Sequence, residues 1–369
     1  MAINKYSGRG GFDEDMFVDL GLTREHAVVI AQAGNFGLSA ASWKTYKTAE
    51  NHLNACMADV GRRMSFPFSV GDVLTFIAWL TLKRQVRAKT IMIYLSGLRM
   101  AHFQRGHFSI NLHSDIVKHV LTGLKQKDVI KDKRRGVVER LPVTMEVMAM
   151  IKEELLKCQW SLNKKRLVWA VSAMAFSGSF RVHELLSREA QCYDPTSTLL
   201  VKDVTWEVLP EQGAGTGSGR VLQVFLKSPK ERRLKLGVQV DLFSTGSYIC
   251  PVEAYLKYKQ SLSSGQKPGS PAFVTCERRG YTGGDFNKDI KELLQGRLDY
   301  TRAKVTSHSF RAGLATEMGK LGYKDDEIQS IGRWSSQAYL TYVKCARLKR
   351  MTIAQELSAS ILAGRRVNS

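Results

Sequence analysis

Four stretches between residues 36 and 130 repeat apolar side chains at spacings of three and four, which is the period of an amphipathic α-helix. The apolar stripes begin at Trp43, Val73, Ile91 and Ile116. Each stripe has to be buried, and the short connections favour packing of each helix against its neighbours. The pattern therefore predicts a compact helical bundle over residues 36–130.

Two segments flank the predicted bundle. Residues 1–35 form an N-terminal extension with a glycine-rich start and an apolar helix around Phe17–Ala33. Residues 131–142 are charged, contain Gly136 and end at Pro142, which is typical of a basic linker between domains.

The remaining residues, 143–369, mix helical and strand patterns. We predict helices at Met145–Cys158, at Leu167–Phe176 and again after Pro251. Three strand-like runs lie between them: Leu199–Val208, Val221–Lys227 and Arg233–Val240, the last two joined by a turn at Ser228–Glu231. These strands are too few for repeated β-α-β units, so the predicted fold class is mainly α with a small antiparallel sheet.

The chain is strongly basic. Its 369 residues hold 55 Lys and Arg against 34 Asp and Glu, a formal charge of +21, and an apolar fraction of 44% argues against a disordered chain. The predicted bundle contributes 13 basic and 5 acidic residues, a net charge of +8. Basic side chains near its helix ends are placed to reach phosphates. These residues are Arg62, Arg63, Lys83, Arg84, Arg87 and Lys89.

Such a charge indicates a polyanionic partner, most often a nucleic acid. No uncharged run is apolar enough to cross a bilayer, so we expect no membrane partner. The six cysteines are scattered without a Cys-x-x-Cys pair, which argues against a zinc site or disulfide framework and favours an intracellular protein.

Short polar motifs occur in a fixed order in the second half. Arg181 and Glu184 are three residues apart, as are His308 and Arg311, so a helix would place each pair on one face. Lys227 ends a strand-like run between the two pairs. A second His-x-x-Arg pair, beginning at His102, lies within the bundle, and we interpret it as a chance match.

The final motif is Gly332-Arg333-Trp334, followed by Tyr339 and Tyr342. Taken singly, each motif has an ordinary structural explanation, such as an ion pair or a core tyrosine. In this order, behind a basic helical bundle, they resemble the tyrosine recombinase (integrase) family from about residue 38 onward. The segment from His308 to Tyr342 is the most specific part, because the family also places its last glycine ten residues before the nucleophilic tyrosine.

Two local matches refine the resemblance. The run Lys-Ser-Pro-Lys-Glu-Arg resembles the family's hairpin and favours Lys227 over Lys230 as the catalytic lysine. The run Gly-Arg-Trp-Ser-Ser is similar to recombinases of eukaryotic mobile elements, the DIRS-type retrotransposons and Cryptons. The family usually has His or Trp directly after the glycine, whereas here Arg333 holds that place and Trp334 follows, so both are candidates.

The resemblance implies a SAM-like, core-binding helical domain over 36–130 and an α+β catalytic domain over 143–369. It also implies roles for the motif residues. Arg181 and Arg311 would hold the non-bridging phosphate oxygens, because guanidinium groups bind them bidentately and stay charged. Glu184 would orient its neighbours.

The same resemblance assigns the proton and phosphoryl transfers. Tyr342 would attack phosphorus and form a 3′-phosphotyrosyl intermediate. His308 would help its hydroxyl to lose a proton, and Lys227 would protonate the departing 5′ oxygen. Tyr339 is the alternative nucleophile, although the ten-residue spacing favours Tyr342.

The implied protein binds double-stranded DNA, needs no cofactor or metal, and works as a tetramer on paired sites through a Holliday junction. The apolar C-terminal residues Ile353, Leu357, Ile361 and Leu362 are candidates for docking on a neighbouring protomer. A mobile-element enzyme of eukaryotes would act in the nucleus, and otherwise in the cytoplasm. Two alternatives stay open: a type IB topoisomerase, and a catalytically silent DNA-binding protein derived from a recombinase.

Overall fold

The computed structural model describes residues 12–63, 66–107, 114–135, 139–209, 219–227, 237–262, 265–298, 303–334 and 337–341. The chain forms two compact units that meet in sequence between Val137 and Val138.

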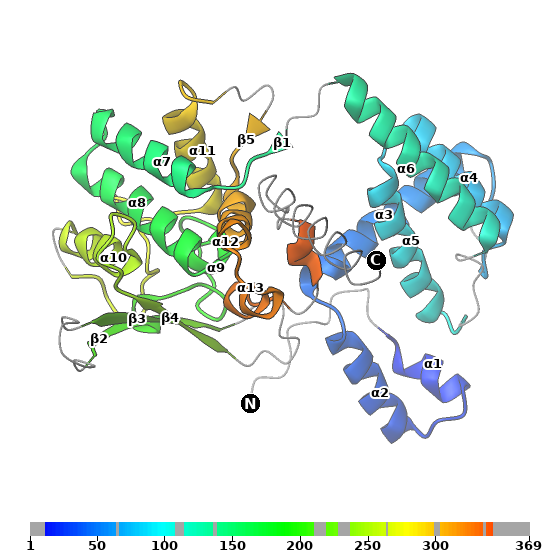
Figure 1. The fold of residues 1–369 in the computed structure, drawn as a ribbon. Coiled ribbons are helices and arrows are strands. Elements are labelled where there is room, and N and C mark those ends of the chain that lie inside the picture. Colours follow the sequence, from blue (N-terminus) through cyan, green and yellow to red (C-terminus); the bar gives the residue numbers. More distant parts are fainter. Residues whose placement is uncertain are drawn as a thin grey trace, which may run out of the picture. The chain divides into compact units, whose positions relative to one another are not determined.

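The first unit is helical (Figure 1). Its helices are α1 (Glu14–Asp19), α2 (Arg24–Phe36), α3 (Ala40–Asp59), α4 (Val70–Lys83), α5 (Ala88–Phe103) and α6 (Asp115–Arg135). Helices α3 to α6 are the four predicted from apolar spacing. Their stripes meet in one core that includes Leu53, Phe76, Leu80, Ile91 and Val117.

The N-terminal extension differs from the prediction of a single helix at Phe17–Ala33. Two helices, α1 and α2, occupy this region. Gly21 adopts a left-handed φ of +90°, which breaks the first helix. Thr23 then begins the second by accepting a hydrogen bond from the backbone N–H of His26.

Helix α6 extends into the segment predicted as a linker. Residues 131–135 continue the helix, although no helix was predicted for these five positions. The physical reason is tertiary: Asp128 accepts a 2.8 Å hydrogen bond from the backbone N–H of Ala88, and Asp132 pairs with Arg87. These contacts fasten the charged second half of α6 to the start of α5.

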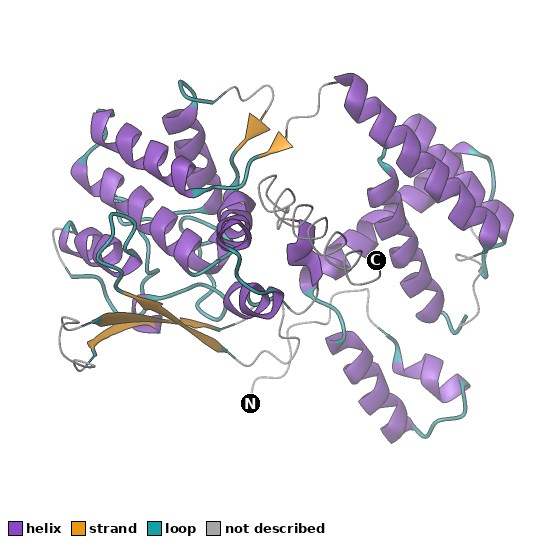
Figure 2. Cartoon of the chain, in the orientation of Figure 1, coloured by secondary structure: helices purple, strands orange, loops and turns teal. Residues whose placement is uncertain are grey.

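The second unit is mainly helical with a small three-stranded antiparallel sheet, which confirms the predicted fold class (Figure 2). It begins with β1 (Glu139–Arg140), α7 (Met145–Lys157), α8 (Leu162–Ser177), α9 (Val182–Leu185), the 3₁₀ turn η2 (Val201–Asp203), β2 (Val204–Val208), β3 (Arg220–Leu226) and β4 (Val238–Phe243). It continues with α10 (Pro251–Gln260), α11 (Gly283–Leu294), β5 (Ala303–Lys304), α12 (Ser307–Leu321), α13 (Asp325–Gly332) and η3 (Gln337–Thr341).

The strands depart from prediction in three places. The first predicted run opens with η2 before β2 begins, and β4 (Val238–Phe243) continues beyond the expected end at Val240. Residues 233–236 of the third predicted run lie outside the described residues. A short parallel pair, β1 with β5, was not predicted because each strand has only two residues. The predicted turn at Ser228–Glu231 lies outside the described residues.

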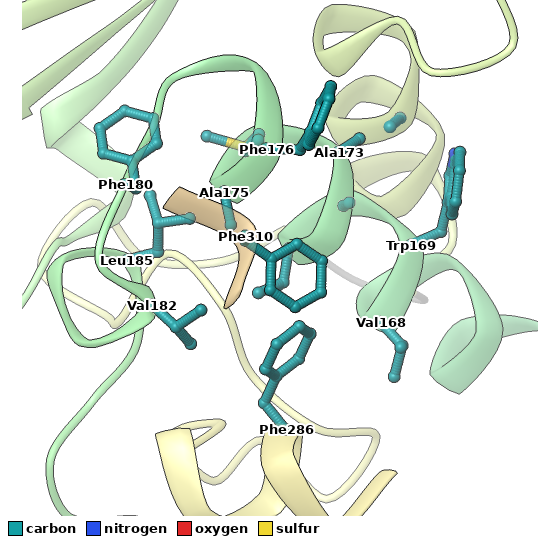
Figure 3. Packing of buried hydrophobic residues seen from close by; sticks show 14 of the residues in the cluster. Val168, Trp169, Ala173, Ala175, Phe176, Phe180, Val182, Leu185, Phe286 and Phe310 are labelled. Carbon is teal, nitrogen blue, oxygen red and sulfur yellow. The ribbon is translucent and has the colours of Figure 1, made fainter. Parts of the chain in front are cut away.

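Helix α8 forms the centre of the second unit. Its residues 167–176 are all buried, so this helix is covered on every side. Helices α7, α10, α11 and α12 pack against it. Figure 3 shows Phe286 of α11 beside Phe310 of α12, with ring centroids 5.3 Å apart. This core fixes the ends of α8 and α12, where the candidate site is built.

None of the helices in the described ranges is long and apolar enough to span a membrane.

Candidate active site

Arg311 lies in the buried face of α12, with a relative exposure of 4%. Its Nη1 donates a 2.8 Å hydrogen bond to the carbonyl oxygen of Ser179, and its Nη2 donates one of 3.3 Å to the carbonyl oxygen of Arg333. The guanidinium carbon lies 4.6 Å from the centroid of the Trp334 ring. These contacts hold the Arg311 side chain in one orientation.

The carbonyl bound by Arg311 belongs to a tight turn after α8. Ser179 has a left-handed φ of +48°, which is uncommon for a residue other than glycine. The Phe180 ring folds back over Gly178, where an added Cβ would lie 2.2 Å from the ring. The turn therefore packs its backbone tightly and delivers the chain to Arg181 at the start of α9.

Arg181 and Glu184 interact as their spacing predicted. Arg181 Nη1 lies 3.0 Å from Glu184 Oε1, and the backbone N–H of Arg181 donates a 3.0 Å hydrogen bond to Glu184 Oε2. The two side chains are 15% and 7% exposed. A largely shielded ion pair of this kind leaves the guanidinium ordered and still charged.

Arg333 is turned toward the same carboxylate. It ends α13 in a left-handed conformation with φ +53°. Its Nη2 lies 3.2 Å from the carbonyl oxygens of Gly178 and Ser179 and 3.4 Å from Glu184 Oε2. Its guanidinium carbon stacks 4.6 Å from the Phe180 ring centroid. Glu184 therefore has two arginines around its carboxylate.

Trp334 follows Arg333 and packs in a different direction. Its ring lies over Gly332 so closely that an added Cβ there would approach the ring to 1.5 Å. The other side of the residue belongs to a small cluster with Met318, Ile328 and Tyr339. This packing places the indole beside Arg311, where its N–H could donate to a ligand.

Of the two candidate tyrosines, the structure describes Tyr339. Tyr339 is 3% exposed, with its ring centroid 5.9 Å from that of Trp334. Burial, with the nearby carboxylates of Asp325 and Asp326, raises the pKa of Tyr339 and disfavours the phenolate. Tyr342 lies outside the described residues.

His308 is exposed in the first turn of α12, one helical turn before Arg311. Its neighbour His183 lies in α9. Desolvation, together with the positive charges of Arg181, His308 and Arg188, lowers the pKa of His183, whereas Glu184 acts in the opposite direction. His308 and His183 are thus close enough for their charges to interact.

Lys227 lies just after β3, as predicted, and is bound by three acceptors. Its Nζ is 2.5 Å from Asp203 Oδ2, 2.9 Å from the carbonyl oxygen of Pro195 and 3.1 Å from that of Thr198. Both Lys227 and Asp203 are largely shielded from solvent. In this arrangement the amine is paired with Asp203. The alternative, Lys230, lies outside the described residues.

The six predicted DNA-binding residues of the first unit are all exposed and lie at two connections. Arg62 and Arg63 follow α3, and the other four surround the corner between α4 and α5. Three of the six have partners that matter for their role. Arg62 Nη1 lies 3.3 Å from Asp72 Oδ1. Arg87 forms a bidentate pair with Asp132 at 2.7 and 3.0 Å, and Arg84 stacks 5.1 Å from the Trp79 ring centroid.

The second His-x-x-Arg pair is structural. His102 is fully buried in the bundle, where Nε2 accepts a 3.0 Å hydrogen bond from the backbone N–H of Phe68. The other nitrogen, Nδ1, lies 2.8 Å from the carbonyl oxygen of Leu98 and therefore carries the proton. This histidine needs its neutral form to make both bonds.

Two residues of the site leave no recognisable pattern in the sequence. Ser179 contributes a backbone carbonyl, which is independent of side-chain identity, and Asp203 pairs with a lysine that is remote in sequence. Among the described residues, no group of three His, Cys, Asp or Glu side chains is placed to hold a metal ion.

No protein-family model and no curated protein sequence matches the chain. Solved structures do share its fold. A XerH site-specific recombinase bound to a palindromic difH substrate aligns with 94% of this chain and 90% of its own, at 12% identity and a TM-score of 0.53. A lambda integrase dimer bound to a COC′ core site aligns with 84% of this chain and 91% of its own, at 12% identity and a TM-score of 0.52.

The Tn1549 transposon integrase in complex with circular intermediate DNA is similar to a comparable degree. The alignment covers 84% of this chain and 92% of that protein, at 14% identity and a TM-score of 0.51. At such identities the likeness establishes the fold, over most of the chain.

Proposed function

We propose that this chain is a site-specific DNA recombinase that cleaves and rejoins DNA strands through a 3′-phosphotyrosyl intermediate. One observation carries the proposal. Arg181 and Arg311, from distant parts of the chain, converge on one turn, and both side chains are largely shielded from solvent. Two fixed guanidinium groups in a shielded place suit an anionic ligand with several oxygens.

A DNA phosphodiester fits this description. Its transition state gathers negative charge on the non-bridging oxygens, and fixed guanidinium groups stabilise that charge without reorganising during the reaction. Arg311 is fixed by two carbonyls and the Trp334 ring, and Arg181 by Glu184. We assign phosphate binding to Arg181 and Arg311, with Trp334 as an additional N–H donor.

The reaction requires a nucleophile, a base and an acid. Tyr342 Oη forms a bond to phosphorus while the bond from phosphorus to the 5′ oxygen breaks. His308 accepts the phenol proton, which its exposed position allows, and Lys227 gives a proton to the leaving 5′ oxygen. Attack of a 5′ hydroxyl from the partner strand reverses these steps, frees the tyrosine and produces a Holliday junction.

The remaining assignments concern DNA and partners. The exposed basic residues at the two connections of the first unit bind the phosphate backbone of duplex DNA. Four protomers act on two paired sites, with the C-terminal residues 353–362, which lie outside the described ranges, as the docking segment. The protein acts in the nucleus if it serves a eukaryotic mobile element, and in the cytoplasm otherwise.

The test is covalent trapping on DNA. The wild-type chain is incubated with labelled, nicked duplexes that carry a randomised centre, and adducts that survive denaturing electrophoresis are isolated. We expect adducts with the wild type and with Tyr339→Phe, and none with Tyr342→Phe. Adducts that survive in Tyr342→Phe and vanish in Tyr339→Phe would overturn the assignment of the nucleophile.

Two other outcomes would replace the proposal. DNA binding without any adduct would indicate a silent DNA-binding protein. Adduct formation with relaxation of supercoiled plasmid by monomers, without pairing of sites, would indicate a type IB topoisomerase.

A further inference from the structure

We propose that Arg333 is a positioning residue, which holds Arg181 in place through Glu184 and through the turn before α9, and that it does not itself bind the DNA phosphate. This inference deepens the proposed function and rests on it for its catalytic consequence. Position 333 is the place where the sequence departs from the family pattern, so its role has to be read from its contacts.

The first argument is the direction of the side chain. The left-handed conformation of Arg333 ends α13 and turns the guanidinium toward the backbone of residues 178 and 179. Stacking on the buried Phe180 ring covers one face of the guanidinium. With 20% of its side chain exposed, Arg333 is bound into the protein interior, whereas a phosphate ligand would require its N–H groups to face the DNA.

The second argument is the shared carboxylate. Glu184 Oε2 accepts from the backbone N–H of Arg181 at 3.0 Å and lies 3.4 Å from Arg333 Nη2, while Oε1 binds the Arg181 guanidinium. A carboxylate held from both sides has little freedom to rotate. Any movement of Arg333 therefore reaches the Arg181 guanidinium through one intervening side chain.

The third argument is the shared carbonyl. The Ser179 oxygen accepts from Arg311 at 2.8 Å and from Arg333 at 3.2 Å. Two cationic donors on one oxygen stabilise the turn in its left-handed conformation, which costs a serine conformational energy. Arg333 thereby joins the two proposed phosphate-binding arginines to the end of α13, nine residues before Tyr342.

The experiment combines kinetics with amide exchange. Single-turnover cleavage of the labelled, nicked duplex is compared for Arg333→Gln, Glu184→Gln and the double variant. Arg220→Gln is the control. Arg220 is an exposed arginine that also pairs with a glutamate, Glu253, in the same unit. We expect each site variant to lose cleavage about 100-fold, because misplacement of a catalytic group by about 1 Å has this effect, and to keep DNA affinity within about twofold.

The double variant provides the decisive comparison. If Arg333 acts through Glu184, the double variant cleaves no more slowly than the slower single variant. Losses that multiply, together with weaker DNA binding, would mean that Arg333 contacts phosphate independently, and would overturn the proposal. Arg333→Lys keeps the charge without the planar fork, so we expect partial rescue of cleavage; full rescue would reduce Arg333 to a general charge effect and also contradict the proposal.

Amide hydrogen exchange of the free protein separates this inference from the proposed function. Arg333→Gln should speed exchange in residues 178–186, and Arg220→Gln should leave it unchanged. Unchanged exchange in Arg333→Gln overturns the positioning role whatever the activity. A wild type that forms no adduct, with faster exchange in Arg333→Gln, refutes the proposed function and leaves the positioning of the turn supported. Arg333→Lys supplies the same exchange readout if Arg333→Gln does not fold.

Discussion

The guanidinium group of Arg311 donates a 2.8 Å hydrogen bond to the carbonyl oxygen of Ser179, which lies 132 residues earlier in the chain. This bond joins the end of α8 to the buried face of α12. It brings together two short motifs that are weak evidence when they are read separately. Their meeting is what turns a set of ordinary ion pairs into a candidate phosphate site.

Arg311→Lys tests whether geometry or charge matters at this position. A lysine keeps the charge but cannot bridge two carbonyls and stack on Trp334 with a planar fork. We expect the rate of cleavage of the nicked duplex to fall about 100- to 1000-fold, which is the usual effect of removing one hydrogen-bond donor that stabilises the charge of the transition state. DNA affinity should change little. Arg220→Lys serves as the control. Equal cleavage by both variants would contradict the assignment of Arg311.

Gly332→Ala tests the packing of Trp334. The new methyl group would lie within the indole ring, so the ring has to move away from Arg311. We expect the free energy of unfolding to fall by about 1–3 kcal/mol, the range for overpacking, and cleavage to fall as well. Gly283→Ala is the matched control, because nothing lies within 4 Å of its added Cβ. Urea unfolding and adduct formation are the measurements; a fully active, stable Gly332→Ala would show that the indole position is unimportant.

Arg84 and Arg87 allow DNA binding to be separated from stability. Arg84→Gln removes a cation that stacks on Trp79, and we expect the slope of log affinity against log salt to become shallower by about one. Arg87→Gln should do the same and also lower the free energy of unfolding by up to about 1 kcal/mol, because its exposed pair with Asp132 is lost. Salt titrations and urea unfolding measure the two effects.

Arg181→Ala should keep most of the DNA binding and abolish cleavage. Identical behaviour of Arg84→Gln and Arg181→Ala would contradict the division between DNA-binding and catalytic arginines.

Lys227 and Asp203 form a largely buried pair, so Lys227→Ala should destabilise the protein by about 3 kcal/mol by leaving a buried carboxylate without its partner. Lys227→Ala combined with Asp203→Asn should recover most of that loss, because the amide is neutral.

The catalytic role of Lys227 is tested on the same stabilised background. A DNA substrate with sulfur in place of the leaving 5′ oxygen needs no proton on departure. If Lys227 is the acid, this substrate restores cleavage to the double variant. Restoration in Lys230→Ala and not in the Lys227 background would transfer the role to Lys230.

His102 predicts the pH dependence of the helical bundle. Desolvation, with help from His107 and Arg105, lowers the pKa of His102, although its bond to Leu98 acts in the opposite direction. The unfolded chain therefore binds a proton at higher pH than the folded one, and stability falls as the pH drops through about 6.5. Urea unfolding at two pH values on either side should show this loss. His102→Gln should be less stable at neutral pH and lose less on acidification; an unchanged pH dependence would contradict the role of His102.

The sequence predicts most of the fold where the signal is local and periodic. Helices α3 to α6 follow from apolar spacing, because four stripes of that length have few alternatives to mutual packing. The break at Gly21 and the continuation of α6 to Arg135 were missed, since one depends on a backbone conformation and the other on ion pairs with a distant corner.

The candidate site divides in the same way. The Arg181–Glu184 pair is an i, i+3 contact and could be predicted from spacing. The inward direction of Arg333 could not, because it depends on a left-handed helix end and on the Phe180 ring, which is 153 positions earlier in the numbering. The pairing of Lys227 with Asp203 is also non-local and leaves no trace in either motif.

The turn at Ser179 has a consequence for how such proteins would vary. Its contribution is a carbonyl oxygen in a left-handed conformation, and every amino acid supplies a carbonyl. The side chain at this position is therefore limited by the confined space and by backbone preference, so glycine would serve where a β-branched residue would not. The residue type at this essential position can thus differ from one relative to another while the chemistry stays the same.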